Sequence, residues 1–113
     1  MKEIKAIIRP SKLLEVTEEL QKIEGLPGVT VSEIKGFGKN RAKNAKDKIV
    51  YEMVDLIPRI KLEVVVNDEI VEEVVNVIQE YSHTGNTGDG KIFIVNVENV
   101  IKIRTNERGV NAI

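Results

Sequence analysis

The sequence of 113 residues contains no cysteine and no tryptophan, and only 4% of its residues are aromatic. The lack of cysteine excludes disulfides, thiol chemistry and cysteine-ligated metal, and it suits a reducing compartment. The scattered aromatic residues do not form a platform on which nucleic acid bases could stack. His83 is the only histidine and has no partner ligand nearby in the sequence, so we expect neither a metal site nor a catalytic residue.

Neither charge nor hydropathy draws this chain to a large charged or apolar partner. Seventeen basic and eighteen acidic residues leave a net charge of -1, so nucleic acid and anionic membranes are not expected to attract it. No apolar run approaches the roughly 20 residues that span a bilayer. The segment 1–4 lacks the features of a signal peptide. We therefore expect one cytoplasmic domain over residues 1–113, small enough for oligomerisation to stabilise it.

The hydrophobic pattern predicts a mixture of strands and helices. Alternation predicts strands at 2–9, 29–35, 59–66 and 91–95, with a short fifth strand at 100–104. Helical spacing follows Ser11, which we expect to act as an N-cap, and runs from Leu13 to Ile23. A second helix is expected from Val71 to Tyr81 after a cap at 67–68.

An internal repeat relates the two halves of the chain. Ala6 and Leu13 correspond to Val64 and Val71, an offset of 58 positions. Two βαβ units of this kind predict an α+β, ferredoxin-like (βαβ)2 sandwich, in which two helices cover one face of a four-stranded sheet. The strands also carry apolar residues toward the uncovered face, which favours a homo-oligomer that buries it.

A long polar loop is expected between the second and third strands, at about residues 38–54. It has no apolar periodicity over 39–48, and loops of this length are usually functional or disordered. Its basic side chains favour docking on an acidic partner surface, whereas the alternative is a solvated arm without a partner. The candidate docking residues are Asn40, Arg41, Lys43, Lys46 and Lys48.

Two motifs are suited to binding phosphate. The glycine-rich turn at 84–91 would let backbone amides face an anion, with Lys91 beside them, although a plain hairpin with an exposed lysine is the alternative. A strand follows the turn, so it is not a P-loop. Lys102 and Arg104 would share one side of a short strand, either as solvated charges or as phosphate ligands. Together, the two motifs could neutralise a di- or triphosphate.

The whole chain resembles the PII signal-transduction proteins in the order and spacing of its motifs. These are the opening at 6–10, the segment 30–38, the turn at 84–93 and the C-terminal segment that begins at 101. The resemblance implies a homotrimer with ATP or ADP, with or without magnesium, in each cleft between subunits. It also implies that the long loop, the T-loop of the family, docks on transporters, enzymes or regulators.

The resemblance also assigns residues to the nucleotide site by position. Those expected to hold the phosphates are Gly88, Asp89, Gly90, Lys91, Lys102 and Arg104. Those expected to line the base, the ribose and the root of the loop are Thr30, Gly36, Gly38, Lys39, Glu63, Val65 and Thr84.

The sequence departs from the family at several of its functional positions. Asn40 stands where members that sense 2-oxoglutarate carry glutamine, which argues against binding of that keto acid through a metal. Lys39 and Lys102 replace arginines and lose their bidentate fork. Glu52 occupies the position of the modified tyrosine, which argues against uridylylation.

We therefore expect a regulator without catalytic activity that responds to adenine nucleotides and controls a membrane transporter or efflux system. The alternatives are a nitrogen-status sensor of the usual 2-oxoglutarate-responsive kind, a trimeric scaffold with an inactive site, and a small phosphohydrolase of the acylphosphatase type. The segment 9–11 does not supply the glycine-rich loop that the phosphohydrolase would need.

Overall fold

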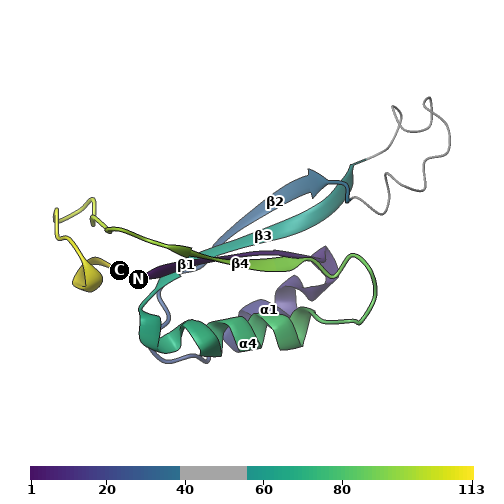
Figure 1. The fold of residues 1–113 in the computed structure, drawn as a ribbon, viewed down its shortest axis with the longest axis horizontal. Helices are drawn as coiled ribbons and strands as arrows, with labels where there is room; N and C mark the ends of the chain where they lie inside the picture. Colours follow the sequence, from purple (N-terminus) through teal and green to yellow (C-terminus); the bar gives the residue numbers. More distant parts are fainter. Residues whose placement is uncertain (39–55) are drawn as a thin grey trace.

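The computed structural model describes residues 1–38 and 56–113, which form one layer of sheet and one layer of helices (Figure 1). The elements are β1 (Lys2–Ile8), α1 (Leu13–Leu20), β2 (Thr30–Gly36), β3 (Ile57–Val66), α4 (Val71–Ser82) and β4 (Lys91–Asn96). The sheet is antiparallel in the order β2-β3-β1-β4, and both helices cover the same face. The predicted α+β ferredoxin-like fold is thereby confirmed. No helix in the described part of the chain is both long and apolar enough to span a membrane.

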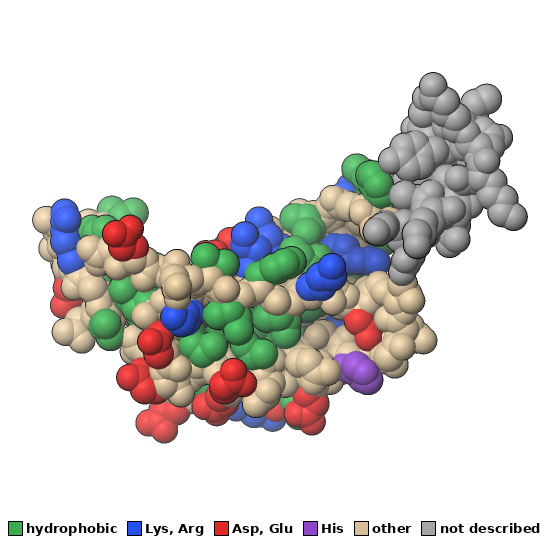
Figure 2. Space-filling view, in the orientation of Figure 1, with side chains coloured by type: hydrophobic (Ala, Val, Ile, Leu, Met, Phe, Trp, Pro, Cys, Tyr) green, Lys and Arg blue, Asp and Glu red, His purple; other side chains and the backbone are tan. Residues whose placement is uncertain are grey.

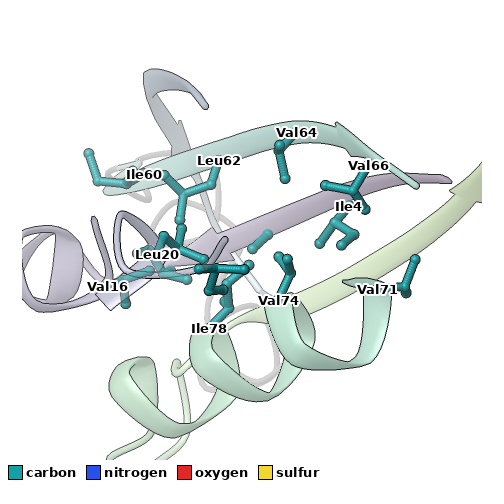
Figure 3. Packing of buried hydrophobic residues seen from close by; sticks show 13 residues of the cluster. Ile4, Val16, Leu20, Ile60, Leu62, Val64, Val66, Val71, Val74 and Ile78 are labelled. Atoms are coloured by element: carbon teal, nitrogen blue, oxygen red, sulfur yellow. The ribbon is translucent and has the colours of Figure 1, made fainter. Parts of the chain in front are cut away.

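The hydrophobic core lies between the sheet and the two helices (Figure 3). Every second residue of β1 and β3 points toward the helices, as the alternation predicts. Ile4 of β1, Leu62 of β3, Leu20 of α1 and Ile78 of α4 all belong to this cluster, and each of these side chains is almost fully buried. The predicted apolar faces of both helices are therefore the ones that pack on the sheet.

The face of the sheet away from the helices is not uniformly apolar, which corrects the sequence-based expectation. Residues directly opposite in an antiparallel pair share a face, so Lys5 of β1 lies on this open face with Glu63 of β3 and Phe93 of β4. Charged and apolar side chains alternate here. Exposed apolar residues are concentrated on the edge strand β4, where Phe93, Ile94 and Val95 are each about half exposed.

Neither helix begins with the predicted side-chain cap. Ser11 lies inside a 3-10 turn over Pro10–Lys12, and α1 follows it without a cap hydrogen bond. Asn67 likewise precedes a 3-10 turn, Asp68–Ile70, and its side chain forms no cap bond. The predicted caps at Ser11 and Asn67–Asp68 are thus wrong, because each chain segment enters its helix through a tight backbone turn.

The predicted fifth strand at 100–104 is also wrong. Among the residues that the structure describes, Ile101 pairs only with Arg108, in an isolated bridge made by the tail of the same chain. The backbone reverses between them, helped by Asn106, whose φ of 62° is tolerated by asparagine. Lys102 and Arg104 therefore do not share the face of a regular strand.

The predicted T-loop lies largely outside the described residues. Its candidate docking residues Asn40, Arg41, Lys43, Lys46 and Lys48 fall in the segment 39–55, as does the predicted loop-root residue Lys39. Gly36 ends β2 opposite Ile57 at the start of β3, so the segment begins and ends at one end of the sheet.

Candidate functional site

The glycine-rich turn connects the C-terminal end of α4 to β4 and lies against the end of β1. Gly88 and Gly90 have φ angles of 102° and 98°, a conformation that side chains disfavour. A Cβ on Gly90 would lie 1.7 Å from the carbonyl oxygen of Ile7. Glycine is thus required at position 90 for conformation and for space, which explains the density of glycine in this motif.

Asp89 is at the centre of the hydrogen bonds that shape the turn. Its Oδ2 accepts from the backbone amides of Thr84 and Gly85, both at 2.8 Å, and its Oδ1 accepts from the Thr84 hydroxyl. Bonds from the Thr84 hydroxyl and amide, followed by those from Gly85 and Arg9, hold the pKa of Asp89 well below its ordinary value of 3.8. The carboxylate is therefore ionised throughout the physiological pH range.

Arg9 and Arg59 lie beside the turn, although the sequence did not indicate either of them as a site residue. Arg9 donates from Nε to Asp89 Oδ1 at 3.0 Å and from its Nη2 to the carbonyl oxygen of Thr87 at 2.9 Å. The Nη2 atoms of Arg9 and Arg59 each lie 3.3 Å from the place where a Gly88 Cβ would be. The only sequence signal was their position, Arg9 directly before Pro10 and Arg59 directly after Pro58.

Several predicted site residues are gathered at this end of the sheet. Lys91 opens β4 opposite Ile7, and its side chain is exposed next to the turn. Gly36 and Gly38 lie at the same end, where β2 leads toward the segment 39–55. A shallow cavity of about 280 Å³ beneath the turn is lined by Asp89, Gly90 and Lys91 together with His83.

The other predicted site residues lie at the opposite end of the sheet. Thr30, Glu63 and Val65 line a cavity of about 370 Å³ there, together with the C-terminal residues Ala112 and Ile113. Thr30 is directly opposite Glu63 in the β2–β3 pair.

Lys102 and Arg104 belong to the C-terminal segment, which Figure 1 shows at the end of the sheet away from the glycine turn. Arg104 is exposed, and Lys102 Nζ lies 3.5 Å from Glu107 Oε1. Within one chain, the predicted site is thus divided into a turn half and a distal half. The cations of the distal half cannot reach a phosphate bound at the turn of the same chain.

The turn half offers chemistry for binding an anion. Its backbone is held open by glycines, and basic side chains of β1, β3 and β4 surround it. Within residues 1–38 and 56–113, no group of three histidine, cysteine or acidic side chains is arranged to hold a metal ion.

The ferredoxin-like sandwich, its glycine-rich turn and its long β2–β3 connection define a small α+β signalling domain. The family model for nitrogen regulatory protein P-II matches residues 1–107. Proteins named nitrogen regulatory protein P-II are 47% identical in Azospirillum brasilense and 50% identical in Rhizobium meliloti strain 1021, each over 113 residues and 100% of both chains. A relative of the same name from Haemophilus influenzae is 45% identical over the same full length.

This chain therefore belongs to the P-II family of nitrogen regulatory proteins. It is a signal-transduction regulator that acts through protein partners and not an enzyme, as the sequence indicated. The family assignment leaves no support for the phosphohydrolase alternative.

Proposed function

We propose that neighbouring copies of this chain form a cleft that binds ATP or ADP, and that the bound nucleotide sets how the T-loop engages a partner. The observation that carries the proposal is the division of the site into two halves at opposite ends of one chain. A head-to-tail contact between copies would join the turn half of one to the distal half of the next. Contacts of this kind form a ring when the rotation between copies closes, and the family resemblance implies a ring of three.

The edge strand β4 supports such an assembly. Phe93, Ile94 and Val95 are consecutive, large and about half exposed, on a strand whose outer backbone edge pairs with no other strand of residues 1–38 and 56–113. Green apolar side chains are also visible over the middle of the molecule in Figure 2. Burial between copies would remove both the apolar surface and the free edge from water.

The phosphates would be bound where the two halves meet. Amides of Gly88 and Gly90 and the ammonium of Lys91 would come from one copy, and Lys102 and Arg104 from the next. Several positive groups around one polyphosphate compensate the charge of the ligand locally, which a chain of net charge -1 cannot do globally. Asp89 would contribute through its backbone amide, since its carboxylate accepts hydrogen bonds from the turn itself.

The base and ribose would occupy the cavity of the distal half. Glu63 can accept a hydrogen bond from an exocyclic amino group, Thr30 can bond a ring nitrogen or hydroxyl, and Val65 supplies apolar contact. An adenine ring offers an amino group and an apolar face that suit these residues. The remaining predicted residues, Gly36, Gly38 and Lys39, would follow the nucleotide toward the root of the T-loop.

The T-loop would be the docking element in the cytoplasm. The segment 39–48 contains five basic side chains and one acidic one, so an acidic partner surface suits it. We favour a membrane transporter or efflux system as the partner. The names of the relatives support a role in nitrogen regulation, while Asn40 argues for a weak response to 2-oxoglutarate.

Titration calorimetry combined with native mass spectrometry tests the proposal. ATP, ADP and AMP are titrated with and without magnesium and 2-oxoglutarate, and Lys91→Gln and Lys102→Gln are compared with Lys22→Gln. Lys22 is an exposed residue beyond α1 that pairs with Glu19, so its substitution is a matched control for lost charge. We expect about tenfold weaker ATP binding in each test variant and little change in the control.

Two results would contradict the proposal. One is a chain that remains monomeric and binds no adenine nucleotide. The other is a wild-type affinity that Lys91→Gln lowers but Lys102→Gln leaves unchanged, because the distal half would then take no part. A strong 2-oxoglutarate response would instead support the alternative of a usual nitrogen-status sensor.

A further inference from the structure

The glycine turn is tied to the end of β1 by a side chain eighty positions away in the sequence. Arg9 donates to Asp89 from Nε and to the Thr87 carbonyl from Nη2, and the two ionic side chains are only 27% and 23% exposed. We propose that Arg9 and Asp89 form a clamp that holds the turn in its anion-binding shape, so that both are positioning residues and not ligands of the phosphates. This inference rests on the proposed function, because it deepens the role of the same turn.

The direction in which Asp89 faces supports a positioning role. Its two oxygens accept four hydrogen bonds, from Thr84 N, Gly85 N, Thr84 Oγ1 and Arg9 Nε. All four donors belong to the protein, and two of them are amides of the turn. A carboxylate has no proton to donate to a phosphate, so the side chain of Asp89 can help an anion only by organising other groups.

Arg9 fixes the other side of the turn. Its bond to Thr87 holds the residue before Gly88, and the Gly88 backbone lies against the same guanidinium group. On the following residues, the close approach of Gly90 to Ile7 fixes the turn against β1 a second time. Residues 87–90 are thus positioned by β1 and by Arg9 directly after it, although their own sequence would permit many conformations.

The clamp also compensates the negative charge of Asp89. An ionised carboxylate in the phosphate turn would repel a polyphosphate bound beside it. The guanidinium of Arg9, 3.0 Å from Asp89 Oδ1, neutralises this charge. The turn can therefore keep an acidic residue for its shape without losing its attraction for an anion.

This neutralisation makes a distinctive prediction about combined substitutions. Removing Arg9 alone leaves Asp89 ionised and uncompensated, so ATP and ADP should bind about tenfold or more weakly, while adenosine is affected far less. Removing the carboxylate as well, in Arg9→Gln/Asp89→Asn, eliminates the repulsion. A part of the polyphosphate affinity should then return, which a merely structural role for two independent residues would not produce.

The experiment measures ligand affinity and turn order separately. Calorimetry with ATP, ADP and adenosine is done on wild type, Arg9→Gln, Arg9→Lys, Asp89→Asn and the double variant, with Lys22→Gln as the control. NMR of the ligand-free proteins follows the Arg9 Nε–H signal and the hydrogen exchange of the Thr84 and Gly85 amides. We expect the Arg9 signal to be lost in Asp89→Asn and the two amides to exchange about tenfold faster in Arg9→Gln. Arg9→Lys keeps the positive charge but loses the guanidinium group that donates two hydrogen bonds. Its ATP affinity and its amide exchange rates should therefore lie between those of wild type and Arg9→Gln.

The outcomes separate this inference from the proposed function. If wild type binds no adenine nucleotide, the proposed function fails, and the amide exchange alone decides whether the clamp orders the turn. The clamp is overturned if Arg9→Gln keeps wild-type amide exchange, or if it keeps wild-type ATP affinity in a protein that binds ATP. It is also overturned if the double variant binds ATP more weakly than either single variant. Should Arg9→Gln fail to fold, the ATP affinity and the amide exchange of Arg9→Lys and Asp89→Asn decide whether the clamp exists.

Discussion

Gly90 is the residue in the turn that leaves least room for substitution. Alanine there would place Cβ 1.7 Å from the Ile7 carbonyl oxygen, on a strand that pairs with β4 over six residues. We expect Gly90→Ala to lower the free energy of unfolding by roughly 2–4 kcal/mol, because β1 and β4 must separate. Urea denaturation followed by circular dichroism measures this change.

Gly25→Ala provides the matched control for conformation without crowding. Gly25 has a φ of 83°, but a Cβ there would have no neighbour within 4 Å. Its replacement should therefore cost only the strain of the left-handed backbone, about 1–2 kcal/mol. Equal losses at both positions would show that the close approach at Gly90 is relieved by a small shift.

The lowered pKa of Asp89 predicts how its contribution depends on pH. A carboxyl group whose pKa is lower in the folded state stabilises that state above its unfolded pKa, ordinarily 3.8, and loses this effect as the pH falls toward the folded value. The difference in stability between wild type and Asp89→Asn should thus stay constant from neutral pH to about pH 5 and shrink below about pH 4.

Thermal unfolding of both proteins across this pH range checks the prediction, with Glu72→Gln on the exposed face of α4 as a control for a lost carboxylate. A difference that already disappears near pH 6 would mean that another group, and not Asp89, accounts for it.

At the scale of elements, the C-terminal segment holds Lys102 in an ion pair with Glu107. Both side chains are partly exposed and Nζ and Oε1 lie 3.5 Å apart, so the pair itself is weak. If Lys102 binds phosphate, Glu107 competes for it. Glu107→Gln should therefore raise ATP affinity about two- to fivefold.

Glu98→Gln removes the same charge from the chain outside this pair and serves as the control. Calorimetry at two salt concentrations separates the local effect from long-range attraction, which salt screens. If Glu107→Gln and Glu98→Gln raise the ATP affinity equally, a specific role of Lys102 loses its support.

The elements could largely be predicted from the sequence, because alternation and helical spacing report which side faces a core. The internal repeat added the prediction that four strands form one sheet with both helices on the same face. The ends of the helices were harder to predict from the sequence. A 3-10 turn at Pro10–Lys12 precedes α1 in place of the cap expected from Ser11. The alternation at Ile101–Arg104 suggested a strand, yet a strand needs a partner strand, and in the described part of the chain only Arg108 of the same tail pairs there.

The sequence indicated candidate residues for the site, but not how they are arranged in the fold. The density of glycine and the adjacent Lys91 indicated the turn, since few other motifs leave so many backbone amides available to bind an anion. The contact between Arg9 and Asp89 joins residues far apart in the sequence, and no local pattern marks it. Asp89 was assigned to the phosphates by position, whereas its observed partners are the donors of the turn itself.

At the scale of the molecule, assembly and ligand binding should be lost together. Phe93 is 47% exposed on the open face of β4, so Phe93→Ala should weaken the contact between copies and shift the protein toward monomers at low concentration. If the proposed cleft between copies binds ATP, the affinity should fall in parallel, because a monomer would then have only half of each site. Native mass spectrometry and calorimetry over a dilution series measure both.

Leu14→Ala is the matched control, because Leu14 is 69% exposed but lies on the helical layer. An assembly that persists in Phe93→Ala would place the contact elsewhere than on the β4 edge.

The placement of the two half-sites at opposite ends of one chain has a genetic consequence. In the proposed ring, a chain damaged at Lys91 and a chain damaged at Lys102 would each lack a complete cleft when alone. In a mixed ring, wherever the intact end of one meets the intact end of the other, an undamaged cleft is rebuilt. Two inactive alleles expressed together should therefore complement each other, whereas two alleles damaged at the same end should not.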